Sequence, residues 1–92
     1  MTRKFSNNSD LFQFINTLID ELKKNQEPHW VSEFENAMAV SFMPGELLGA
    51  LRLTLLKFQK TKIPKKLKLS KDIQEAIRVL DEALGYWRPS IL

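Results

Sequence analysis

The sequence PGELLGALRLTLLKFQ, residues 44–59, decides the fold of this 92-residue chain. Proline followed by glycine suits the first turn of a helix, where a backbone N–H has no helical partner to lose. The apolar residues that follow recur at helical spacing: Leu47, Leu48, Ala50, Leu51, Leu53, Leu55 and Phe58. So broad an apolar face is typical of a central helix with neighbours on two sides. Gly49 is unfavourable inside a helix by about 1 kcal/mol relative to alanine, so we expect it to permit close helix approach.

Three further helices are predicted around this central one. The apolar stripe of residues 10–24 begins with Leu11, follows Ser9 or Asn8 as N-cap and ends in two lysines, which complement the helix dipole. Pro28 suits the start of a second helix, through about Val40. The last helix spans residues 70–84, with Ser70 as its cap and Gly85 at the position of a left-handed C-cap.

Helical periodicity fails between residues 60 and 69. Proline restricts the residue before it, Ile63, to extended backbone, and Lys65 to Leu69 alternate between lysine and leucine at the end of the segment. We therefore predict an extended basic strap that lays its leucines on the core. Residues 1–92 are predicted to form one compact all-α domain, a four-helix bundle-like fold. A flexible N-terminus (1–8) and a C-terminal tail (86–92) flank it.

The composition excludes several classes of protein. Hydrophobic residues make up 43% and charged residues 27% of the chain, which is ordinary for a globular domain. No apolar run reaches the roughly 18 residues of a membrane-spanning helix, and the N-terminus has no apolar signal core, so we expect a cytoplasmic protein. The absence of cysteine excludes disulfides and thiol chemistry.

The residues with catalytic potential do not form a recognisable site. His29 and Glu33 are four residues apart and share a helix face, but a zinc site needs a third protein ligand. The acidic residues fall on faces that we expect to be solvated, and adjacent helical residues point about 100° apart. No phosphate-cradling glycine loop or nucleophile motif is present. We therefore expect no enzyme, no catalytic or metal-binding residue and no cofactor.

The clearest anomaly is electrostatic. Residues 1–50 have a net charge of −3 and residues 51–92 a net charge of +6, giving +3 for the chain. Fifteen residues hold seven lysines: Lys57, Lys60, Lys62, Lys65, Lys66, Lys68 and Lys71. This segment either binds nucleic-acid phosphates or an acidic protein, or it serves only to keep a loop solvated.

Two other groups are candidates for partner binding. Carboxylates that would face a basic partner are Asp20, Glu21, Glu27, Glu33 and Glu35, because opposite potentials steer association. Tyr86, Trp87 and Arg88 are residue types that dominate interface hot spots, although aromatic residues at this position also close the ends of bundles. Trp30 has the spacing of a core residue.

One stretch resembles a known kind of protein. Glu27-Pro28-His29-Trp30, followed by Phe34 and Ala37, is similar to the His-Trp helix of small bacterial proteins, some of which look like immunity proteins of polymorphic toxin systems. The resemblance implies a non-enzymatic protein-binding module that neutralises a cognate toxin by occlusion. The alternatives are a nucleic-acid-binding protein that uses residues 57–71, and a homo-oligomer that uses Tyr86, Trp87 and Ile91.

Overall fold

Residues 8–39 and 44–85 are described by the computed structural model, and they form five helices. These are α1 (Asn8–Lys24), α2 (Pro28–Ala39), α3 (Pro44–Gln59), α4 (Ile63–Lys66) and α5 (Ser70–Leu84). The described ranges contain no strand, so the all-α prediction is confirmed. The first helix begins at Asn8, within the segment predicted as a flexible N-terminus, and the predicted end of the second helix, Val40, lies outside the described residues.

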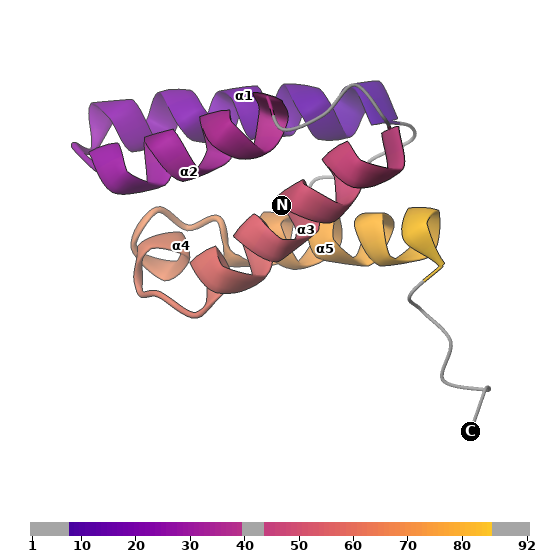
Figure 1. The fold of residues 1–92 in the computed structure, drawn as a ribbon. Coiled ribbons are helices and arrows are strands. Elements are labelled where there is room, and N and C mark those ends of the chain that lie inside the picture. The colour runs from indigo at the N-terminus through magenta and orange to yellow at the C-terminus, as the bar shows by residue number, and fades with distance from the viewer. Residues whose placement is uncertain (1–7, 40–43, 86–92) are drawn as a thin grey trace.

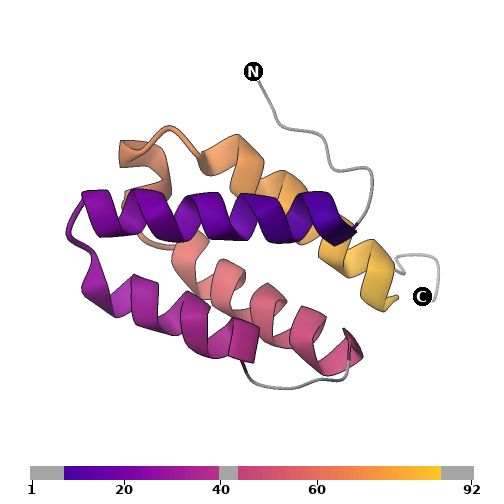
Figure 2. The same ribbon diagram turned by 90° about the horizontal axis from the view of Figure 1, so that it is seen from above.

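The helices form two layers (Figure 1). One layer contains α1 and α2, and the other contains α3 and α5, with α4 at one end. Helix α3 packs against α2, α4 and α5, which confirms its predicted central position. The turn between α1 and α2 lies at the same end of the molecule as α4 in both views (Figure 2). Lys23 and Lys24 at the end of α1 and the lysines of α4 therefore lie at the same end of the domain.

The core lies between the two layers. Each long helix contributes a stripe of buried apolar residues, as its spacing predicts: Leu11, Phe14, Ile15, Leu18, Ile19, Leu22, Phe34, Ala37, Leu48, Leu51, Leu55, Phe58, Ile73, Ala76, Ile77 and Leu80. Burial of each leucine, isoleucine or phenylalanine in this set stabilises the domain by about 1.5–3 kcal/mol before entropy is counted. The close match between stripe and core shows that hydrophobic burial positions all four long helices.

Three aromatic rings join α2 to α3. Phe34 and Phe58 are fully buried and meet edge to face, with ring centroids 5.4 Å apart. Trp30 is half-buried, and its ring centroid lies 5.1 Å from that of Phe58. Edge-to-face pairs add about 0.5–1.5 kcal/mol beyond their buried area. Trp30 therefore packs on the core, as predicted, but keeps part of its ring exposed.

The strap prediction for residues 60–69 is wrong in its geometry. Residues 63–66 form the single-turn helix α4, with Pro64 near its start. Proline is tolerated there because an N–H in the first turn lacks a helical partner in any case. The Thr61 hydroxyl donates to the Phe58 carbonyl (2.7 Å) and accepts from the Ile63 N–H (3.2 Å), which links α3 to α4. The expected packing of the leucines is confirmed, since Leu67 and Leu69 lie against the core.

The predicted cap at the C-terminus of α5 is confirmed, whereas the predicted cap at its N-terminus is wrong. Leu69, not Ser70, is the N-cap, and no side chain bonds the cap position. Gly85 adopts the left-handed conformation with φ +75°, and its N–H bonds the carbonyls of Asp81 and Glu82. This is the predicted C-cap, and it favours glycine because a side chain at positive φ is strained.

Two predictions about α3 are corrected. A Cβ placed on Gly49 meets no atom within 4 Å, so this glycine does not allow any close helix approach. The spacing predicts Leu53 on the broad apolar face of α3, but 57% of this residue is exposed. The outer side of α3 around these two residues faces solvent because α2, α4 and α5 cover only the remaining sides of the helix.

Candidate interaction surfaces

The seven predicted lysines gather at the corner where α3 ends, α4 forms and α5 begins. Lys57 lies in α3, Lys71 is the second residue of α5, and the remaining five lie in and around α4. All seven are exposed. The segment 57–71 contains no acidic residue, so its formal charge is +7. We call this surface the lysine corner, and it is the strongest concentration of charge in the described structure.

Among the described residues, no ion pair neutralises the lysine corner. Within residues 8–39 and 44–85, none of its seven ammonium groups forms a salt bridge with a carboxylate. Other cations in the same ranges are paired: Lys23 lies 3.8 Å from Glu35, and Lys24 lies 3.8 Å from Glu21. Unpaired charges of one sign repel one another, so the lysine corner has a concentrated positive charge that these ion pairs do not offset.

One hollow lies within the lysine corner, between α4 and the start of α5. It is lined by Lys65, Lys68, Ser70, Lys71 and Asp72. Lys68 has a left-handed backbone (φ 60°), and its N–H bonds the Lys65 carbonyl at 3.1 Å. This turn brings α4 and α5 together. The lysine count predicted the charge of this surface but gave no indication that Ser70 and Asp72 share a hollow with three of the lysines. Lys65, Lys68 and Lys71 follow one another at intervals of three residues, and this spacing is the sequence signal that could have indicated a shared hollow.

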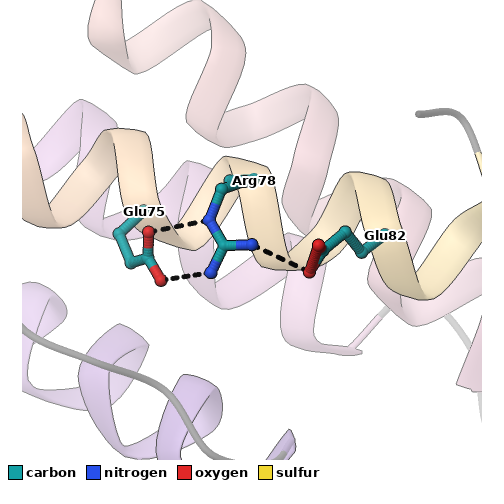
Figure 3. Close-up of polar contacts among 3 residues, drawn as sticks. All are labelled: Glu75, Arg78 and Glu82. Carbon is teal, nitrogen blue, oxygen red and sulfur yellow. Dashed lines mark hydrogen bonds and ion pairs between the residues drawn. The ribbon is translucent and has the colours of Figure 1, made fainter. Parts of the chain in front are cut away.

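The positive surface ends within the first turns of α5. Further along the helix, Arg78 donates two hydrogen bonds to Glu75, at 2.9 and 2.5 Å, and one to Glu82, at 2.9 Å (Figure 3). The hydrogen bonds that Arg78 donates to Glu75 raise the pKa of Arg78 above its already high value, and the charge of Glu82 adds to this. Two carboxylates and one guanidinium leave this part of the surface net negative, so the positive charge of the corner does not continue along α5.

The candidate acidic residues do not form one surface. Asp20 of α1 and Glu35 of α2 line the same groove, together with Lys23, Ile19 and Met38. The ion pair between Lys23 and Glu35 reduces the negative charge there. This groove is the largest grouping of the predicted acidic contacts.

The other three candidate carboxylates lie elsewhere. Glu27 lines a separate hollow with Val31 at the start of α2. Glu21 pairs with Lys24 along α1. Glu33 lies two residues from Glu35 on α2 and is half-buried, and residues two apart do not share a helix face. The structure therefore divides the five predicted acidic contacts instead of assembling them.

His29 is exposed and contacts the ring of Trp30 edge to face, with centroids 5.1 Å apart. The part of the chain that the structure describes holds no group of three or more His, Cys, Asp or Glu side chains suited to a metal ion. The predicted interface residues Tyr86, Trp87 and Arg88, and Ile91 of the proposed oligomer contact, lie outside the described residues.

The fold and its surfaces define a small all-α domain with one concentrated basic corner. No helix within the described ranges is long and apolar enough to cross a membrane. Comparison of the chain with protein families, curated proteins and solved structures gives no match.

Proposed function

We propose that this chain is a non-enzymatic protein-binding module that recognises an acidic surface on its partner through the lysine corner. The observation that supports the proposal is the set of seven exposed lysines without a carboxylate partner among the described residues. Forming an interface with an acidic surface would relieve the repulsion among these lysines, and opposite potentials would speed association.

The acidic residues along α5 favour an acidic protein over nucleic acid as the partner. A polyanion that extended from the corner along α5 would meet Glu75 and Glu82. Segment 57–71 contains no arginine, and its one aromatic residue, Phe58, is fully buried. The segment therefore offers neither the arginine forks nor the exposed aromatic platforms that nucleic-acid surfaces use. A compact acidic patch fits these limits better than a long strand.

The rigid core beneath the corner favours binding by occlusion. Phe58 and Leu55 are fully buried at the end of α3, and Leu67 and Leu69 hold the segment after α4 against the core. A partner docked on the lysine corner would therefore meet a pre-formed surface and have its own acidic surface covered. The immunity role implied by the sequence resemblance is the specific form of this proposal: occlusion of a cognate toxin in the cytoplasm of a bacterium.

The proposal is tested by capture from a lysate of the source organism, with the full chain as bait. The bait is compared with the variant Lys65→Glu/Lys68→Glu and with the control Lys23→Glu/Lys24→Glu, which has the same change in charge but lies on α1. We expect one protein to be retained in stoichiometric amount by the wild type and the control, lost with the first variant, and unaffected by nuclease.

Three results would contradict the proposal. They are the absence of any stoichiometric partner, equal retention by all three baits, and release of the partner by nuclease. If a partner is retained, the immunity role requires that co-expression of this chain protects cells from that partner's toxicity, and that the corner variant fails to protect them.

A further inference from the structure

The hollow between α4 and the start of α5 sets three lysines apart from the rest of the lysine corner. Lys65, Lys68 and Lys71 line it together, although they belong to α4, the following turn and α5. Lys57, Lys60 and Lys62 precede α4 and do not line it. The seven lysines therefore differ in geometry, even though all are exposed and share one sign of charge.

The chemistry of the lining suits a phosphoryl group. Three ammonium groups and the carboxylate of Asp72 leave a formal charge of +2, and Ser70 adds a hydroxyl donor. A phosphorylated side chain carries a charge of about −1.5 to −2 near neutral pH and offers three acceptor oxygens. Lysine binds phosphate as a point charge, whereas planar bidentate binding of a carboxylate is the speciality of arginine. No arginine lines this hollow.

We propose that this hollow is the subsite that takes the phosphoryl group of a phosphorylated side chain on the acidic partner. The inference rests on the proposed function, because it names the group that the lysine corner recognises. A phosphodiester of nucleic acid carries only one negative charge and repeats along a strand, so it matches a single hollow of charge +2 less well than a phosphomonoester does.

The experiment measures binding of the full chain to three probes by calorimetry. The probes are a short acidic peptide with one phosphoserine, the same peptide with glutamate at that position, and a uridine oligonucleotide. Each is titrated into the wild type, into Lys65→Gln/Lys68→Gln/Lys71→Gln, and into the control Lys57→Gln/Lys60→Gln/Lys62→Gln. Both triple variants remove three positive charges from exposed positions, where substitutions seldom disturb folding, and circular dichroism checks this.

We expect the wild type to prefer the phosphopeptide over the glutamate peptide by about tenfold. The variant in the hollow should lose about tenfold or more in affinity for the phosphopeptide and lose the preference, whereas the control should lose less than about threefold and keep it. The oligonucleotide should bind more weakly than the phosphopeptide to the wild type.

The inference is overturned if both triple variants weaken binding equally, if the two peptides bind alike, or if the oligonucleotide is the tightest ligand. It is also overturned if no peptide binds. Equal binding of both peptides that still depends on the lysines would leave the proposed function standing and remove only the subsite. The capture experiment decides the proposed function separately, because it does not depend on phosphorylation.

Discussion

The guanidinium of Arg52 on α3 donates a hydrogen bond from Nε to the carboxylate of Asp81 on α5. Only 25% of the Arg52 side chain and 24% of the Asp81 side chain are exposed. This ion pair spans the interface between α3 and α5. The C-terminal end of α3 and the N-terminal end of α5 both lie in the lysine corner. It adds a directional contact to the apolar packing of α3 on α5, so it helps to fix the position of one helix relative to the other.

Removal of this ion pair should destabilise the domain. We expect Asp81→Asn to lower the free energy of unfolding by about 1–2 kcal/mol, because a hydrogen bond to a charged group contributes about that much when partly buried. Urea denaturation of the single variants Asp81→Asn and Arg52→Gln and of the double variant gives the coupling energy. A coupling energy of zero would show that the two side chains act independently.

The two glycines Gly49 and Gly85 should respond to alanine in opposite ways. Gly49→Ala adds a Cβ in open space within α3, so it should stabilise the domain by about 1 kcal/mol through helix propensity. Gly85→Ala places a side chain at φ +75° and should destabilise it by about 1–2 kcal/mol. Thermal unfolding followed by circular dichroism measures both. A loss of stability on Gly49→Ala would mean that this side of α3 is covered.

Two leucines on opposite sides of α3 test the position of the core. Leu55 is fully buried, whereas Leu53 is 57% exposed. Leu55→Ala should lower the free energy of unfolding by about 2–5 kcal/mol, and Leu53→Ala by less than about 0.5 kcal/mol. Equilibrium denaturation compares them directly. Similar losses for the two substitutions would be inconsistent with this packing of the central helix.

The lysine corner should make stability depend on salt in the absence of any partner. Repulsion among unpaired ammonium groups is screened by salt, so the melting temperature should rise as sodium chloride is added. Lys65→Gln/Lys66→Gln should raise stability at low salt by up to about 0.5 kcal/mol and weaken the salt dependence. The matched variant Lys23→Gln/Lys24→Gln loses attractive contacts with Glu35 and Glu21, so it should not be stabilised. Identical behaviour of the two variants would show that the corner is not under repulsive strain.

The sequence predicted the four long helices because each carries an apolar stripe that the core buries. The stripe from Leu11 to Leu22 and the stripe from Ile73 to Leu80 are buried as their spacing requires. The interpretation of residues 60–69 was wrong because the effect of proline on Ile63 is only a local preference. Packing of Ile63 and Leu67 on the core and the bonds made by Thr61 outweigh it.

The candidate surfaces were predictable only in part. Lysine count gives the charge of residues 57–71, but the hollow depends on how α4 turns into α5, which no periodicity describes. The five predicted acidic contacts are close in sequence, yet only Asp20 and Glu35 share a groove, because the crossing of α1 and α2 decides which faces meet. Exposure of Leu53 likewise depends on where neighbouring helices lie and not on its own hydrophobicity.

The most direct test of the central claim maps the binding surface by nuclear magnetic resonance. The ¹⁵N-labelled full chain is titrated with a peptide rich in aspartate and glutamate. We predict that the amide shifts that change fall in residues 57–71 and that added salt reverses them. Changes confined to the groove of Asp20 and Glu35, or no changes at peptide concentrations that saturate other lysine-rich binders, would contradict the claim that the lysine corner is the binding surface.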